Sequence, residues 1–135
     1  MRIGFLFALV LFTGALRAQQ SPHRIVWEIN AKDTSVHSAL FRQINNVLAE
    51  APNTQIEVVF HGNAILVATS DSSLHLEKLK RDMQRGVSFA VCNNSMRRLK
   101  VEPSRIVPGV TIVPVAILEL VKRQEQGWSY IKAGY

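Results

Sequence analysis

Apolar residues along this chain alternate between short continuous runs and longer stretches with helical spacing. Continuous runs of this length are typical of buried strands, and they fall at residues 25–29, 56–60, 87–91 and 110–113, with a short final strand or tail at 128–131. Apolar residues three or four positions apart predict helices over residues 36–48 and 76–83. The patch at residues 64–68 fits either a loop or a helical turn.

Capping residues indicate where the other helices begin and end. Ser72 or Ser73 can cap the second helix, and Asn93-Asn94-Ser95 can cap a short helix that runs through Leu99, because such side chains accept from free N–H groups of the first turn. Pro is favoured at the first position of a helix and Gly just after its end. This predicts a last helix between Pro114 and Gly127, whose core-facing residues are Val115, Leu118 and Val121 with Ile117 alongside.

Strand and helix signals alternate along residues 24–131, and the strands are apolar along most of their length. This alternation is typical of an α/β protein, and strands that are apolar on both faces belong to a parallel sheet covered on both sides. We therefore expect a mainly parallel sheet of about five strands with helices on both faces, in a flavodoxin-like layering. No repeat or interior linker divides the chain, so residues 19–135 are expected to form a single α/β domain.

The first eighteen residues have the three-part layout of a secretory signal peptide. A positive start at Arg2 precedes an apolar run over residues 3–12, and Ala18 before Gln19 offers a cleavage point. The run is shorter than the ~20 residues that span a bilayer. We expect a signal peptide over residues 1–18 and no stable membrane span after cleavage; an uncleaved anchor and a buried N-terminal strand are the alternatives.

Charge and motifs exclude several classes of partner. Without Arg2 and Arg17, the 16 basic residues fall to fourteen against ten acidic ones, a net charge near +4 that is scattered along the chain. With two Trp and two Tyr and no binding motif, we expect no nucleic-acid partner. The sequence has no glycine-rich phosphate loop, and its four histidines lack metal-ligand spacing, so we expect no cofactor and no metal.

Reactive side chains follow two of the predicted strands. In open parallel sheets, functional groups collect beyond the carboxyl ends of the strands, where His61 and Cys92 fall. If Asn93 or Asn94 begins a helix, its N-terminus places partial positive charge near the Cys92 sulfur, and Arg97 lies one turn further on. Both effects favour the thiolate, the form that attacks sulfur.

A lone cysteine in an exported chain cannot form an intrachain disulfide, so Cys92 is buried and inert, reactive, or paired with another chain. His61 either acts in chemistry or forms a hydrogen bond at a strand end. The two side chains can form a base–nucleophile pair only if their strands are neighbours, which the sequence leaves open.

Several segments together resemble the DsrE/DsrF-like family, in particular its small exported members. The segments are VVFHG at 58–62, GVSFAVCNNSM at 86–96, PGVTIVP at 108–114, and the tail between Glu119 and Lys132. They cover most of residues 24–132 in order. The resemblance implies an α/β fold around a parallel sheet, assembly as homo-oligomers, and, in the better-studied relatives, transport of sulfur as a persulfide on a cysteine.

Transferred to this chain, the resemblance makes Cys92 the candidate sulfur acceptor, with a sulfur donor or acceptor, a protein or a small molecule, as its partner. His61, Asn63, Asn93 and Asn94 are the candidate binding residues around it. Export together with the resemblance predicts a periplasmic or secreted protein. Two other hypotheses stay open: an oligomeric ligand-binding module with a structural cysteine, and a ligand pocket around His61 and Asn63 without thiol chemistry. Whether the protein turns over a substrate is open as well.

Overall fold

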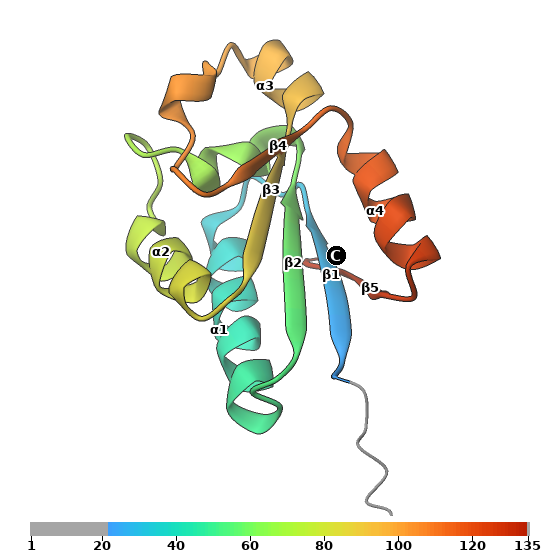
Figure 1. The fold of residues 1–135 in the computed structure, drawn as a ribbon. Coiled ribbons are helices and arrows are strands. Elements are labelled where there is room, and N and C mark those ends of the chain that lie inside the picture. The colour runs from blue at the N-terminus through green and yellow to red at the C-terminus, as the bar shows by residue number, and fades with distance from the viewer. Residues whose placement is uncertain (1–21, 135) are drawn as a thin grey trace, which may run out of the picture.

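Five parallel strands form one sheet in the order β4-β3-β2-β1-β5 (Figure 1). The computed structural model describes residues 22–134, so the signal peptide expected over residues 1–18 lies outside the described residues. The strands are β1 Arg24–Ile29, β2 Gln55–Phe60, β3 Ser88–Cys92, β4 Thr111–Val113 and β5 Ser129–Lys132. This confirms the α/β class and the parallel sheet of five strands.

Helices cover both faces of the sheet, also as expected. They are α1 Thr34–Glu50, α2 Leu76–Gln84, α3 Asn93–Leu99 and α4 Ala116–Glu125, with 3₁₀ segments η1 Gly62–Ala68 and η2 Pro103–Arg105. Strands β1 to β4 lie side by side in chain order across the sheet. The helix α4 then connects β4 to β5, which pairs with β1 at the opposite edge. Because parallel crossovers are right-handed, the reversal of direction puts α4 on the face opposite α1 and α2, as Figure 1 shows.

Two separate hydrophobic clusters fill the space on either side of the sheet. The larger one lies under α1 and α2 and includes the buried Phe41, Phe60 and Phe89. The smaller one lies under α4 and contains Val26, Val59, Ala90, Cys92, Val113, Ala116 and Leu120. Cys92 is therefore part of the thinner layer, which a single helix covers.

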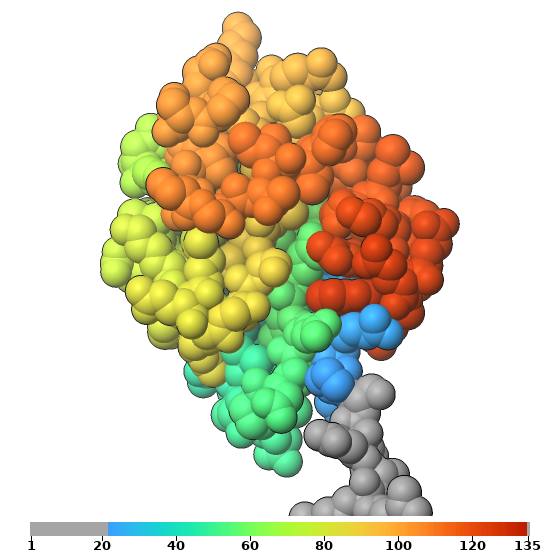
Figure 2. Space-filling model, viewed as in Figure 1, coloured from blue at the N-terminus to red at the C-terminus, as the bar shows by residue number. Residues whose placement is uncertain are grey.

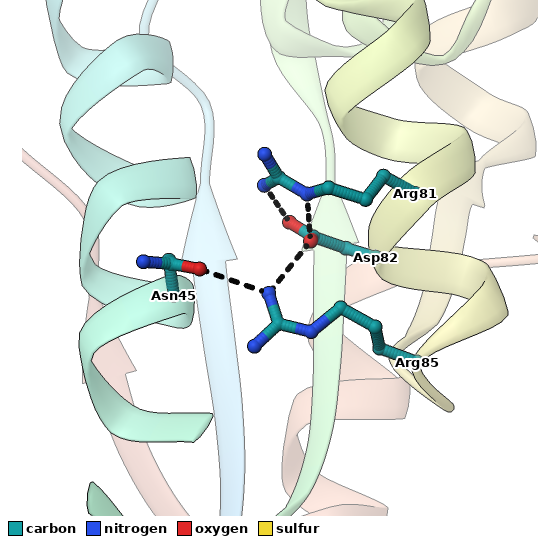
Figure 3. Close-up of polar contacts among 4 residues, drawn as sticks. All are labelled: Asn45, Arg81, Asp82 and Arg85. Atoms are coloured by element: carbon teal, nitrogen blue, oxygen red, sulfur yellow. Dashed lines mark hydrogen bonds and ion pairs between the residues drawn. The ribbon is translucent and has the colours of Figure 1, made fainter. Parts of the chain in front are cut away.

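A buried carboxylate of α2 takes part in a group of hydrogen bonds that connects α2 to α1 (Figure 3). Asp82 accepts two hydrogen bonds from Arg81, at 2.9 and 3.1 Å. Arg85 donates both to Asp82 at 3.4 Å and to Asn45 of α1 at 3.1 Å. The carbonyl of Asp82 also accepts from the N–H of Val87 at 3.0 Å. These bonds hold α2 against α1 and set the turn that leads into β3.

The ends of two helices differ from the prediction. At α2 the N-cap is His75, because the Ser73 hydroxyl donates to the carbonyl of Val67 and accepts from the N–H of His75. The last helix begins at Ala116 rather than at Pro114. Its buried residues are Ala116 and Leu120, whereas the predicted core residues Leu118 and Val121 are exposed, together with Ile117. The expected inward face of this helix was therefore wrong.

Candidate functional site

Cys92 lies where one strand ends and two helices begin. It is the last residue of β3 and the N-cap of α3, and it is a free cysteine that is only 5% exposed. Its Sγ accepts a hydrogen bond from the N–H of Ala116, the first residue of α4, at 3.4 Å. Figure 2 shows the surfaces of α4 and of the segment before β4 closing over this end of the sheet. The sulfur thus meets free N–H groups in the first turns of two helices.

These contacts stabilise the thiolate. Burial acts to raise the pKa of the Cys92 thiol, because it disfavours the charged form. Hydrogen bonds from the N–H groups of Ala116, Ser95 and Asn94, and from the Ser95 hydroxyl, outweigh burial and hold the pKa of Cys92 below its ordinary value. The thiolate is the form that attacks sulfane sulfur.

Ser95 connects the cysteine to the end of β2. Its side chain is buried in the first turn of α3, where it supports the Cys92 sulfur. The same hydroxyl oxygen accepts from the N–H of Gly62 at 2.9 Å. Gly62 has a φ of 55°, in the left-handed region that glycine adopts at little cost. One serine therefore fixes the chain after β2 relative to the chain after β3.

His61 belongs to a second polar group at the same edge. Its Nε2 donates to Glu28 Oε1 at 2.8 Å, and the Tyr130 hydroxyl donates to the other oxygen of that carboxylate. Burial acts to raise the pKa of the Glu28 carboxyl, but hydrogen bonds from Tyr130 and His61 and the charges of His61 and Lys132 lower it overall. Glu28 is therefore ionised, and its hydrogen bond raises the pKa of Tyr130 to about 12.

His61 and Cys92 follow neighbouring strands at the same level. Phe60, the last residue of β2, is paired with Val91 of β3, so His61, just after β2, lies at the level of Cys92, the last residue of β3. The contact with Glu28 places the His61 ring on the face that α4 covers. This meets the requirement that their strands be neighbours. However, no hydrogen bond joins His61 to Cys92 within residues 22–134; the His61 ring is oriented by Glu28.

The three asparagines predicted as binding residues occupy two places. Asn93 is half-buried and Asn94 exposed, both at the start of α3 beside Cys92. The Asn94 side chain accepts from Arg97 at 2.6 Å, while its backbone N–H supports the sulfur. Asn63 is exposed in η1 and lines a cavity beside α1 and α2 instead. The structure thus gathers Cys92, His61, Asn93 and Asn94 at one edge and leaves Asn63 elsewhere.

Sequence reasoning missed three residues of this site: Glu28, Ser95 as a support of the thiolate, and Tyr130. Glu28 carried a signal, because it is a lone carboxylate within the apolar run of the first strand. Tyr130 carried none, since it reaches Glu28 only when β5 pairs with β1, 102 residues along the chain.

Neither a metal-binding cluster nor a membrane-spanning helix is present in the described part of the chain. Within residues 22–134, no group of three His, Cys, Asp or Glu side chains is placed to hold a metal ion. Over the same residues, no helix has the length and apolar character needed to cross a bilayer.

Comparison with known proteins assigns a family. The model of the DsrE/DsrF-like family matches residues 15–133. A solved protein of unknown function, MTH1491 from Methanobacterium thermoautotrophicum, shares 28% sequence identity and a TM-score of 0.78, over 82% of this chain and 98% of that chain. No curated protein matches the sequence.

Two more solved structures share the fold at low identity. The ychN protein from E. coli is 9% identical with a TM-score of 0.70, over 83% of this chain and 99% of that chain. BT1422 from Bacteroides thetaiotaomicron, a conserved protein of unknown function, is 14% identical with a TM-score of 0.67, over 81% of this chain and 93% of that chain.

Proposed function

Since the chain belongs to the DsrE/DsrF-like family, we propose that it is a sulfur-relay protein that carries sulfane sulfur as a persulfide on Cys92. Family membership points to sulfur relay in general. The observation that supports persulfide chemistry on this residue is the set of hydrogen-bond donors that contact its sulfur. The N–H group of Ala116 and the donors of α3 favour the thiolate although the side chain is buried.

The proposed loading step is thiol–disulfide-type exchange at sulfur. The Cys92 thiolate attacks the sulfane sulfur of thiosulfate or the terminal sulfur of a polysulfide, and a new Sγ–S bond forms. The donor's S–S bond breaks, and its electron pair leaves with sulfite or with the shortened polysulfide. An acceptor thiolate then attacks the outer sulfur and releases the Cys92 thiolate. No external oxidant or reductant is consumed in either step.

The surrounding residues have supporting roles in this proposal. The N–H groups that stabilise the thiolate also lie where negative charge develops on the departing thiolate when sulfur is passed on. His61, held by Glu28, and Asn93 shape the approach to the sulfur from the end of β2 and the start of α3.

Intact-mass measurement tests the proposal directly. The purified protein is incubated with polysulfide or thiosulfate, and its mass is measured with and without a reductant. We expect a gain of one or more sulfur atoms that the reductant reverses and that Cys92→Ser abolishes. Full sulfur loading of Cys92→Ser would contradict the assignment of the acceptor.

A second candidate function is an oligomeric binding module in which Cys92 is structural. The burial of Cys92 in the cluster under α4 favours this alternative, since free cysteines commonly pack in cores. Thiol labelling of the native protein separates the two. Labelling that proceeds only in denaturant favours the structural role, whereas labelling under native conditions with a pH midpoint below that of an ordinary cysteine favours the relay.

The cell compartment and the assembly are part of the proposal. We propose that residues 1–18 direct export and that the mature chain acts in the periplasm or outside the cell. We also propose that it forms a homo-oligomer, because α4 exposes Ile117, Leu118 and Val121 along one side. The mass of the protein recovered from the exported fraction tests the first point.

A further inference from the structure

The polar group of Glu28, His61 and Tyr130 lies on the face of the sheet that α4 covers. His61 follows β2 at the level of Cys92, and its backbone is still extended, with a φ of −142°. Val59 and Cys92 both belong to the cluster under α4, and His61, two residues after Val59, points to the same face. Because neighbouring strands lie about 4.8 Å apart, the His61 and Cys92 side chains are neighbours.

The Nδ1 atom of His61 is accessible from solvent. The N–H of Nε2 donates to Glu28 Oε1 at 2.8 Å, so in the neutral ring Nδ1 is the nitrogen that carries the lone pair. Within residues 22–134, Nδ1 has no hydrogen-bond partner, yet it is not among the unpaired polar atoms that the fold buries completely. The side chain as a whole is 19% exposed. A molecule that approaches the end of β2 from solvent can therefore give a proton to this atom.

Glu28 and Tyr130 hold the ring in this orientation. Glu28 is 8% exposed, and each of its carboxylate oxygens accepts one hydrogen bond, from His61 and from the Tyr130 hydroxyl. Burial acts to raise the pKa of the Glu28 carboxyl, but these bonds and the charges of His61 and Lys132 lower it overall. An ionised carboxylate on one ring nitrogen stabilises the imidazolium that forms when the other nitrogen takes up a proton.

Discharge of a persulfide to a thiol requires a proton to move. An ordinary thiol has a pKa of about 8.5 and arrives protonated at neutral pH, whereas the thiolate is the form that attacks. The outer sulfur of a persulfide on Cys92 is anionic, and it repels an attacking thiolate until it is protonated. The acceptor sulfur must therefore lose a proton, and the outer sulfur must gain one.

We propose that His61 is a catalytic residue that carries this proton, an inference that rests on the proposed persulfide chemistry. Nδ1 takes the proton from the acceptor thiol and gives it to the outer sulfur. The acceptor thiolate attacks that sulfur and forms a new S–S bond. The Sγ–S bond breaks, and its electron pair stays on Cys92 Sγ, which the N–H of Ala116 stabilises. One thiol and one persulfide anion give one protonated persulfide and one thiolate, so no oxidant or reductant is consumed.

The other two residues of the group act through His61. Glu28 is a positioning residue, because its carboxylate keeps the proton of the neutral ring on Nε2 and leaves Nδ1 as the acceptor. Tyr130 holds the second oxygen of that carboxylate. The lack of a hydrogen bond between His61 and Cys92 fits this role, since the proton to be moved belongs to the acceptor and not to Cys92.

The test compares two acceptors that differ in whether they bring a proton. The protein is loaded with polysulfide, and the loss of the added sulfur is followed by intact mass after 2-mercaptoethanol or sulfite is added at mildly alkaline pH. Sulfite takes up the sulfur as thiosulfate without giving or gaining a proton. His61→Gln retains an N–H donor for Glu28 but has no basic nitrogen. It should discharge to 2-mercaptoethanol about a hundredfold more slowly than wild type, whereas discharge to sulfite should change far less.

The matched control is His23→Gln, which makes the same change at an exposed histidine before β1 and should keep the wild-type rates. Equal rates of wild type and His61→Gln with 2-mercaptoethanol, or an equal loss with both acceptors, would overturn the role of His61. A wild-type protein that takes up no sulfur would contradict the proposed function itself, so the two failures are distinguishable.

The state of the ring is measured without any sulfur chemistry. ¹⁵N NMR of the imidazole should show the proton of the neutral ring on Nε2 in wild type and a mixture of both forms in Glu28→Gln. Tyr130→Phe changes a residue that is 41% exposed, and it should slow discharge to 2-mercaptoethanol several-fold. A proton on Nδ1 in the neutral ring of wild type would overturn the proposal, since that nitrogen could not then accept one from a thiol.

Discussion

At the scale of single residues, the pKa of the Cys92 thiol depends on donors supplied by its neighbours. The sulfur is buried, which by itself disfavours the thiolate, and the hydrogen bonds of Ala116, Ser95 and Asn94 reverse that preference. Among these donors, only Ser95 contributes through its side chain as well as its backbone. A substitution of Ser95 can therefore remove part of the stabilisation of the thiolate while the Cys92 thiol itself stays in place.

Ser95→Ala should raise the pKa of Cys92, because the hydroxyl that supports the sulfur is lost. The pH midpoint of alkylation by iodoacetamide should then move upward, and the rate at neutral pH should fall several-fold. The variant should also lose about 1 kcal/mol of stability, since the Gly62 N–H loses its acceptor. Ser88→Ala, at the exposed start of β3, is the control. An alkylation profile unchanged from wild type would argue against a role of Ser95 at the sulfur.

Glu28 makes the stability of the fold depend on pH. The pKa of its carboxyl is lowered in the folded state, so its ionised form stabilises the fold above the ordinary value of 4.5, and this contribution is lost as the pH falls through the lowered pKa. In urea denaturation at several pH values, Glu28→Gln should be less stable at neutral pH, by about 1–3 kcal/mol, with a flatter decline in acid. Glu77→Gln, an exposed carboxylate on α2, should keep the wild-type profile. Parallel profiles for wild type and Glu28→Gln would contradict the assignment.

At the scale of elements, the strands were predictable and the docking of the last helix was not. Continuous apolar runs specify β1, β2 and β3 closely, because a strand buried on both faces needs apolar residues at every position. The last helix has apolar residues on several sides, so its sequence supports more than one inward face. Which face is buried depends on where the helix begins, and its start at Ala116 turns Leu120 inward and Leu118 outward.

Two leucines of α4 test this orientation. Leu120 is 4% exposed and Leu118 is 64% exposed. Leu120→Ala should cost about 2–3 kcal/mol of unfolding free energy, since it leaves a cavity in the small cluster under α4. Leu118→Ala should change it by no more than about 0.5 kcal/mol. Chemical denaturation of both variants measures the difference, and equal losses would mean that the helix docks differently.

The candidate site could be predicted only in part, because its geometry depends on how the strands and helices are arranged in the whole fold. Cys92 and His61 were identifiable because each directly follows an apolar strand. Their alignment requires β2 and β3 to be neighbours in register, and that follows from the order of the whole sheet. The position of Asn63 in the wall of a cavity depends on the packing of α1, η1 and α2, which leaves no local pattern in the sequence.

At the scale of the whole molecule, the reversal of chain direction after β4 produces two unequal faces. The face under α1 and α2 has the larger core and the cavity that Asn63 lines. The other has a single helix, the cluster around Cys92 and the Glu28–His61–Tyr130 group. The helix α4 is therefore one of the elements that cover the sulfur, since its first N–H group bonds to Sγ.

The exposed side of α4 bears on this access. Ile117, Leu118 and Val121 lie within one turn of each other and are exposed, and Tyr130 of β5 is exposed on the same face of the sheet. If a second copy of the chain covers this surface, light scattering should show a species larger than the monomer. Leu118→Glu should shift it toward the monomer, because a charge would be buried in the contact.

The matched control for this experiment is Leu74→Glu, which makes the same change at an exposed leucine before α2. It should leave the assembly intact, and equal dissociation of both variants would argue against the α4 surface. Association through α4 would also hold the helix in place over Cys92. Native alkylation of Cys92 should then be faster in the Leu118→Glu monomer than in the assembled protein, because a helix that lacks its covering partner opens more often. Equal alkylation rates in the two states would mean that the assembly does not control access to the sulfur.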